Sequence, residues 1–186
     1  MFGDSITWGA VDREGGGWVT RLRNWCEKNL EDVEIYNLGI SADSTNELLK
    51  RFVPECEARS PDVIVFAIGI NDSQYIGSRE YLRTTPKVFE ENLEELIKQA
   101  GHFTKQIIFV GTTRVDESKT TPIPWRENTF YKNEFVEEFD CLIKSVAERH
   151  RLLFVDVSKT LEPEELEDGL HPNSRGHEKL FETILH

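Results

Sequence analysis

Two short polar segments at opposite ends of the sequence hold the residue types of a hydrolytic site. Gly3-Asp4-Ser5 stands near the start of the chain, and Asp168 and His171 stand near its end. A serine hydroxyl is a poor nucleophile unless a base removes its proton, and the base works best when a third group orients it. A separation of three residues across a turn lets the Asp168 carboxylate reach the Nδ1–H of His171 and leaves Nε2 free to accept the proton of Ser5. These residues predict a Ser-His-Asp triad for acyl transfer.

Acyl transfer also requires hydrogen-bond donors for the oxyanion that forms on the substrate, and three are available. The backbone N–H of Ser5 is one. The N–H of Gly39 is a second, because a residue without Cβ lets the backbone approach a substrate closely. The side-chain amide of Asn71 is a third, and a neutral amide suits a developing alkoxide. We therefore predict an oxyanion hole made by Ser5, Gly39 and Asn71.

The apolar runs that must position these residues alternate between strand-like and helix-like patterns. Nearly continuous apolar strands, typical of a buried parallel sheet, are predicted at 33–38, 62–68, 106–110 and 152–157, after a first strand shortened to residues 1–2. Helical periodicity predicts helices over 17–30, from 44 or 45 through 53, 88–100, 135–146 and 172–185. This alternation predicts an α/β fold, a three-layer α/β/α sandwich. Ligands bind at the carboxyl ends of strands in such sheets, where Ser5, Gly39 and Asn71 all fall.

The bulk composition is that of one globular domain spanning residues 1–186. Hydrophobic residues make up 38% of a chain long enough to bury a core, and no linker or repeat divides it. The formal net charge of −12 disfavours nucleic acid as a partner, and no apolar run is long enough to span a membrane. The three cysteines fit neither a zinc site nor a redox pair, and no signal peptide is visible ahead of Gly3. We therefore expect a cytoplasmic protein, while its oligomeric state stays open.

Further residues beside the predicted machinery are candidates for substrate contact, namely Asp4, Trp8, Asp72, Arg114 and Trp125. Asp4 adjoins the nucleophile, where its alternative role is to hold the turn through local hydrogen bonds. Trp8 either walls a substrate pocket or packs against neighbouring side chains. Arg114 and Trp125 belong to the long polar segment 112–129, and segments of this length are often lids or binding loops.

Four ordered blocks give the sequence a family resemblance. GDSITWG, NLGISADST, GIND and DGLHPNSRGH resemble the motif blocks of the SGNH hydrolases, the GDSL esterase/lipase family. The resemblance covers nearly the whole chain. It implies a flavodoxin-like sandwich with a five-stranded parallel sheet, Ser5 as the nucleophile, Gly39 and Asn71 in the oxyanion hole, and Asp168 and His171 as the remaining triad members. It also implies ester hydrolysis without a metal or another cofactor.

The front of the chain departs from the family pattern, because family members carry several apolar residues before the first block. Either the first strand is a stub or the natural chain begins upstream of Met1. His177 follows His171 by six residues, so the two imidazoles do not share a helix face and no metal site is predicted. We expect His177 to be a packed or solvated histidine.

These observations predict a serine esterase that acts on a small-molecule ester. Short acyl groups, such as acetyl groups on a sugar, are favoured because the long loops are polar and no long apolar run lies near the site. The alternatives are a thioesterase or lysophospholipase of the same family, and a non-catalytic carbohydrate-binding module whose serine is idle. A phosphohydrolase is disfavoured, since the sequence lacks a metal-ligand pattern for such chemistry.

Overall fold

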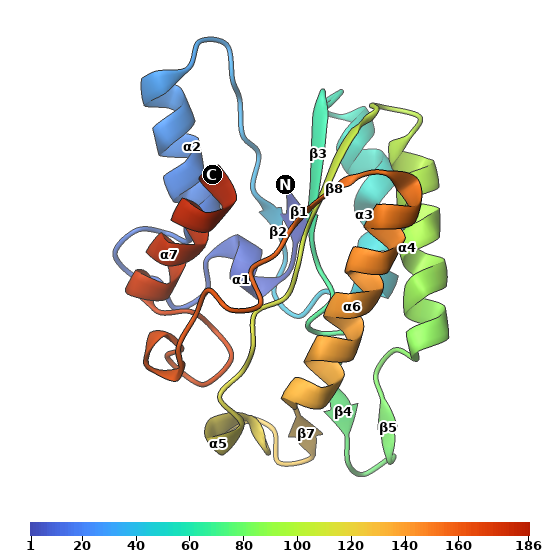
Figure 1. Ribbon diagram of the computed structural model, residues 1–186, viewed down its shortest axis with the longest axis vertical. Helices are drawn as coiled ribbons and strands as arrows, with labels where there is room; N and C mark the ends of the chain where they lie inside the picture. The colour runs from blue at the N-terminus through green and yellow to red at the C-terminus, as the bar shows by residue number, and fades with distance from the viewer.

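The computed structural model describes residues 1–186 and is built around a five-stranded sheet (Figure 1). All neighbouring strands in this sheet are parallel, and their order is β2-β1-β3-β6-β8. The strands are β1 (Phe2–Gly3), β2 (Leu38–Gly39), β3 (Val63–Ala67), β6 (Gln106–Val110) and β8 (Leu153–Val155). The parallel sheet predicted from the apolar runs is therefore confirmed.

Helices cover both faces of the sheet, which confirms the predicted three layers (Figure 1). One face is covered by α3 (Thr45–Glu57), α4 (Pro86–Ala100) and α6 (Asn133–His150), and the other by α2 (Trp18–Asn29) and α7 (Ser174–Leu185). The core under the first group is rich in phenylalanine, with the rings of Phe52 and Phe66 centred 5.4 Å apart. Burial of these apolar side chains is the main force that holds the layers together.

Three of the long helices, α3, α4 and α7, are preceded by a polar residue whose side chain accepts a free backbone N–H group. Ser44 and Glu47 form a reciprocal capping box at the start of α3. Thr85 caps α4, whose first residue is Pro86, and Asn173 caps α7 through the N–H of Gly176. These local signals explain why the helices begin where the periodic pattern predicts.

A second, three-stranded antiparallel sheet lies beyond the carboxyl ends of the parallel strands (Figure 1). It joins β4 (Tyr75–Ile76), β5 (Tyr81–Leu82) and β7 (Thr129–Phe130), while the short helices α1 (Ser5–Trp8), α5 (Glu117–Thr120) and η1 (Pro163–Glu165) complete the chain. The sequence predicts an irregular segment over 112–129 and no strand over 72–85. The structure pairs them, because β4 bonds to β7 as well as to β5.

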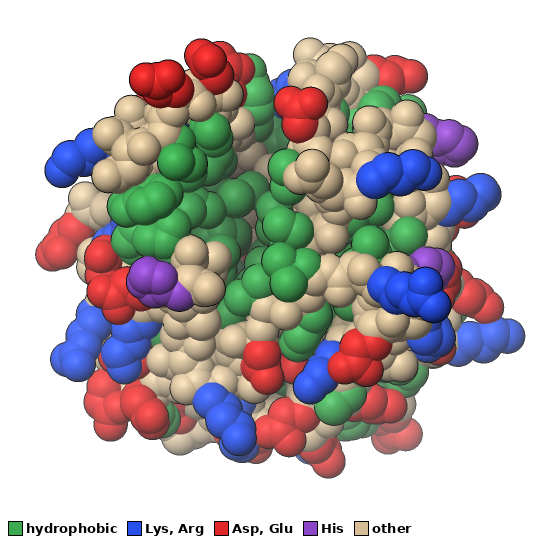
Figure 2. Space-filling model, turned by 45° about the horizontal axis from the view of Figure 1, so that its top comes forward, with side chains coloured by type: hydrophobic (Ala, Val, Ile, Leu, Met, Phe, Trp, Pro, Cys, Tyr) green, Lys and Arg blue, Asp and Glu red, His purple; other side chains and the backbone are tan.

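The strand predicted over 33–38 is wrong for most of its length. Only Leu38 and Gly39 form β2, because β1 offers only Phe2 and Gly3 as ladder partners. The preceding residues line an apolar groove of about 580 Å³ at the amino ends of the strands. Figure 2 shows hydrophobic side chains gathered in a hollow on this side of the molecule. No helix has the length and apolar character needed to cross a membrane.

His177 joins α7 to α2 and the adjoining loop. The N–H of Trp18 donates to its Nδ1 at 3.3 Å, and its Nε2 lies 3.4 Å from the carbonyl oxygen of Ala10. Because Nδ1 accepts, the proton of the neutral ring is on Nε2. The side chain is fully buried, so His177 is the packed histidine that the sequence allows, and burial lowers its pKa to about 4.

We predict that His177 makes stability depend on pH. Below about pH 6.5 the unfolded chain takes up a proton at His177, whereas the folded protein resists it down to about pH 4, so stability from this residue falls as the pH falls. In urea titrations, the destabilisation caused by His177→Gln should therefore be largest at pH 7 and shrink by up to about 3 kcal/mol at pH 4. A destabilisation that is the same at both pH values would contradict this role.

Candidate active site

The turn that carries Ser5 leaves the middle of the parallel sheet. β1 ends at Gly3, Asp4 caps α1, and Ser5 is the first helical residue. Asp4 Oδ1 accepts the N–H of Ile6 at 2.9 Å, and Thr7 Oγ1 donates to the carbonyl of Ala67 in β3 at 3.3 Å. These bonds hold the turn from both sides, although the strand before it contains only two residues.

Ser5, His171 and Asp168 form one continuous chain of hydrogen bonds. Ser5 Oγ lies 2.9 Å from His171 Nε2, and His171 Nδ1 lies 2.7 Å from Asp168 Oδ2. Asp168 Oδ1 also accepts the backbone N–H groups of Leu170 and His171 at 3.0 and 2.8 Å. Burial alone would raise the pKa of Asp168, but the bonds from the His171 ring and backbone outweigh it and hold this pKa below its usual value. The carboxylate therefore stays charged and orients the imidazole.

The loop that carries Asp168 and His171 is closed on itself by backbone hydrogen bonds. The N–H of Glu167 donates to the carbonyl of His171 at 2.9 Å, and a bridge pairs Leu166 with Pro172. Gly169 stands at the turn with φ +88°, a conformation that favours glycine. Its carbonyl accepts the N–H of Asp116 at 2.8 Å, which ties this loop to the segment 112–129.

Asn71 is held in one orientation by a buried polar network. Its Nδ2 donates to the carbonyl of Asp43 at 2.9 Å, and its Oδ1 accepts the hydroxyl of Tyr131 at 2.6 Å. Tyr131 in turn accepts from Gln74 Nε2 at 2.8 Å, and burial raises the pKa of Tyr131 far enough that the phenol stays a donor. Since an amide nitrogen carries two hydrogens, one remains for an incoming oxyanion. The sequence predicts Asn71 but gives no sign of Tyr131, which lies 60 residues further along the chain, or of Gln74 as the partner of Tyr131.

The structure gives Gly39 a packing role in addition to the predicted one, which stays a prediction. Its N–H donates to Asn37 Oδ1 at 3.0 Å, so this donor is already engaged. A Cβ at Gly39 would collide with the backbone of α1, including the Trp8 nitrogen and the Asp4 carbonyl. The absence of a side chain therefore serves the close approach of α1 to β2.

Ala42 is a residue that sequence analysis misses. It adopts φ +67°, which is unusual for a residue with a Cβ, and its N–H has no hydrogen-bond acceptor. The next residue, Asp43, accepts from Asn71, so the free N–H of Ala42 lies on the loop that Asn71 contacts. No sequence signal marks this position, because alanine rarely adopts a left-handed backbone conformation.

Three of the predicted substrate contacts are directed elsewhere. Asp72 is fully buried and accepts from the N–H and Oγ1 of Thr45 at 3.0 and 2.6 Å, so the prediction of a direct contact is wrong for Asp72. Asp4 is 3% exposed and holds the turn, which was its alternative role. Burial raises the pKa of Asp4 to about 7 and that of Asp72 to about 6. Arg114 is exposed and pairs with Glu137 on α6 at 3.2 Å.

The two remaining candidates are exposed tryptophans. The side chain of Trp8 is 58% exposed at the end of α1. Trp125 is 54% exposed, and its ring is stacked on the ring of His171, with centroids 5.8 Å apart and an interplanar angle of 29°. The structure therefore brings Trp125 against His171, the predicted base, and its contact with a substrate stays a prediction.

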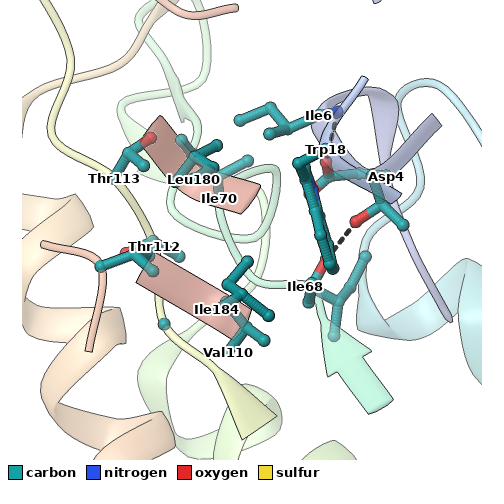
Figure 3. A pocket seen from close by; sticks show the side chains of 14 residues that line it. Asp4, Ile6, Trp18, Ile68, Ile70, Val110, Thr112, Thr113, Leu180 and Ile184 are labelled. Atoms are coloured by element: carbon teal, nitrogen blue, oxygen red, sulfur yellow. Dashed lines mark hydrogen bonds between the residues drawn. The ribbon is translucent and has the colours of Figure 1, made fainter. Parts of the chain in front are cut away.

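A small cavity of about 30 Å³ lies behind the turn that carries Ser5 (Figure 3). Asp4, Ile6 and Thr113 line it together with apolar residues of β3, α2 and α7. The buried hydroxyl of Thr113 has no hydrogen-bond partner, and the space is sufficient for about one water molecule. Nowhere in the structure do three or more His, Cys, Asp or Glu side chains gather as ligands for a metal ion.

Comparison with known proteins gives one family over nearly the whole chain. The model of the GDSL-like lipase/acylhydrolase family matches residues 1–179. An acetylxylan esterase from Geobacillus stearothermophilus is 26% identical over 164 residues, which cover 82% of this chain and 71% of that protein. An arylesterase from Vibrio mimicus is 22% identical over 184 residues, which cover 99% of this chain and 84% of that protein.

The fold is also shared with solved structures. The crystal structure of a lipase/acylhydrolase from Enterococcus faecalis matches with a TM-score of 0.81 and 29% identity, and the match covers 99% of this chain and 91% of that one. Sequence and structure thus agree on the same class of proteins.

We predict opposite effects for two substitutions on the β2–α3 connection. Gly39→Ala places a methyl group against the backbone of α1, so it should lower the free energy of unfolding by about 1–3 kcal/mol and reduce esterase activity with it. Ala42→Gly removes the strain of a positive φ and should raise the free energy of unfolding by roughly 0.5–1 kcal/mol. Urea denaturation of both variants tests the pair, and a Gly39→Ala protein as stable as the wild type would contradict the packing role.

Proposed function

The chain belongs to the GDSL-like lipase/acylhydrolase family and is a carboxylic ester hydrolase, and we propose that it works through an acyl-enzyme formed on Ser5. The observation that carries the proposal is the hydrogen-bond chain from Ser5 Oγ through His171 to Asp168. This chain ends on the hydroxyl of a residue fixed at the carboxyl edge of the sheet, where ligands of parallel α/β folds bind.

The geometry supports a two-step reaction. Ser5 Oγ attacks the acyl carbon while His171 Nε2 takes its proton, and the imidazolium then gives that proton to the leaving alcohol. Asp168 stays ionised throughout, which stabilises the imidazolium and keeps Nε2 directed at Ser5. In the second step His171 accepts a proton from water, the hydroxide attacks the acyl carbon, and Ser5 recovers its proton as the acid leaves.

The oxyanion is proposed to bind to the N–H of Ser5, the Nδ2 of Asn71 and the N–H of Ala42. The fixed orientation of its side chain supports Asn71 as a donor. Ala42 is supported because its backbone N–H, on the loop that Asn71 contacts, has no hydrogen-bond acceptor. Gly39 was the predicted third donor, but its N–H is bound by Asn37, so we assign its place to Ala42. Each such donor contributes about 10²–10³ in rate when it is aimed at the developing charge.

Short acyl groups, acetyl above all, are the proposed acyl part of the substrate. The large apolar groove of about 580 Å³ lies at the opposite edge of the sheet, away from Ser5, so it offers no site there for a long acyl chain. One of the relatives is named an acetylxylan esterase, which agrees with a small acyl group. The substrate is accordingly a small-molecule ester.

We predict graded losses in the triad variants, measured as kcat/KM for p-nitrophenyl acetate. Ser5→Ala and His171→Ala should each lower it by at least about 10³-fold, because each removes the nucleophile or its base. Asp168→Asn should lower it by about 10²–10⁴-fold, since the amide no longer fixes the tautomer of His171. Arg114→Ala is the matched surface control, and circular dichroism checks that every variant folds.

Rates near wild type in both Ser5→Ala and His171→Ala would exclude the proposed mechanism. A wild-type protein without hydrolytic activity would instead support the binding-module alternative, in which the serine is idle.

We also predict a preference for short p-nitrophenyl esters. In a series of straight acyl chains, kcat/KM should be highest for acetate or propionate and fall as the chain lengthens, because the large apolar groove that could hold a longer chain lies at the opposite edge of the sheet. An optimum beyond about eight carbons would refute the small acyl site.

A further inference from the structure

Exposed tryptophan in this protein lies where the chemistry takes place. Of the four tryptophans, Trp18 is 1% exposed and Trp25 is only partly exposed. Trp8 and Trp125 are more than half exposed, and they belong to the helix that carries Ser5 and to the loop that touches His171. An indole ring loses much favourable burial when it is left in water, so its exposure at a reaction site suggests that another apolar surface covers it.

The loop holds Trp125 in a fixed place. The N–H of Ile123 donates to the carbonyl of Thr129 at 2.9 Å, and the N–H of Thr129 donates to the carbonyl of Arg126 at 3.0 Å. Ile123 is 3% exposed and packs in a small core with Tyr131 and Leu170. The turn is therefore closed and attached to the protein on one side, while the indole ring stands outside beside His171. Such a preorganised ring loses little entropy when it binds a ligand.

The position of Trp125 relative to His171 defines the part of the substrate that it meets. His171 Nε2 faces Ser5 Oγ and must also reach the leaving oxygen to protonate it. The alcohol attached to that oxygen consequently lies alongside His171, and Trp125 is the exposed apolar surface against this ring. The acyl group, by contrast, lies on the side of the oxyanion donors.

We propose that Trp125 forms a leaving-group site for alcohols that are themselves rings with an apolar face, either a pyranose or a phenol. The inference rests on the proposed function, because it needs His171 as the group that protonates the leaving oxygen. A ring of this kind packs flat on the exposed indole and buries far more apolar area than a short chain alcohol does. Trp125 is thus a specificity-determining residue, and Ser5, His171 and Asp168 alone perform the chemistry.

The same stacking allows a competing role, in which the indole face stabilises the imidazolium of His171 by a cation–π interaction. That role acts on the base itself, so it would affect every ester equally and would shift the pH profile. A leaving-group site affects only esters whose alcohol is a ring. The two roles are therefore separated by the choice of substrate.

The test compares three acetate esters by pH-stat, namely ethyl acetate, phenyl acetate and a fully acetylated methyl xylopyranoside. The variants are Trp125→Ala, Trp125→Phe and the control Tyr36→Ala, which removes a 46% exposed ring at the opposite edge of the sheet. We expect Trp125→Ala to lower kcat/KM at least tenfold for one or both ring esters, mainly through KM, and less than twofold for ethyl acetate. Trp125→Phe should restore part of the loss, and Tyr36→Ala should resemble the wild type.

The outcomes distinguish a sugar from a phenol as the leaving alcohol, and they distinguish failure of the leaving-group site from failure of the proposed function. A loss confined to the xylopyranoside identifies a sugar as the ring, and a loss confined to phenyl acetate identifies a phenol. An equal loss on all three esters with a shifted pH profile, or no loss on any, would overturn the leaving-group site. Failure of the proposed function would appear differently, as hydrolysis of ethyl acetate that survives Ser5→Ala.

Discussion

The structure depends on one close contact, the backbone of α1 against the backbone of β2 at Gly39. No side chain fits between them, and a Cβ at Gly39 would meet the first and last residues of the turn that carries Ser5. Gly3 is equally constrained, because a Cβ there would collide with Thr7 and with the carbonyl of Ala67. Close backbone packing at Gly3 and Gly39 thus fixes the turn that carries Ser5. Although β1 contains only two residues, it is paired with β2 on one side and β3 on the other.

Buried polar residues extend this constraint to the rest of the site. Asp72, in the loop after β3, bonds to the first residue of α3, and Tyr131, the residue that follows β7, holds Asn71. Such groups are costly to bury unless their hydrogen bonds are made, so a fully bonded network allows few alternative arrangements. The carboxyl edge of the sheet is therefore held by bonded polar groups at Asn71 and Asp72, whereas its tryptophans Trp8 and Trp125 are exposed.

The sequence predicts the features whose signals are local. The strands at 62–68 and 106–110 are found because β-branched runs define them directly, and the structure places the predicted residues Ser5 and Asp168 each within hydrogen-bond distance of His171. The strand at 33–38 is not found, since a strand also needs a partner and β1 pairs only with Leu38 and Gly39. The roles of Gly39 and Asp72 and the free N–H of Ala42 depend on contacts between distant segments, which spacing alone does not reveal. The sequence predicts that Gly39 lacks a side chain so that a substrate can approach, and the structure shows that the same lack of a side chain lets α1 approach β2.

Covalent labelling with a fluorophosphonate tests the central claim most directly, since the probe reacts with an activated serine. Intact-mass measurement and peptide mapping should show one adduct, located on Ser5, in the wild-type protein. The adduct should be lost in Ser5→Ala and form far more slowly in His171→Ala, because the hydroxyl then lacks its base. An active enzyme that carries no adduct on Ser5, or carries it on another serine, would contradict the account.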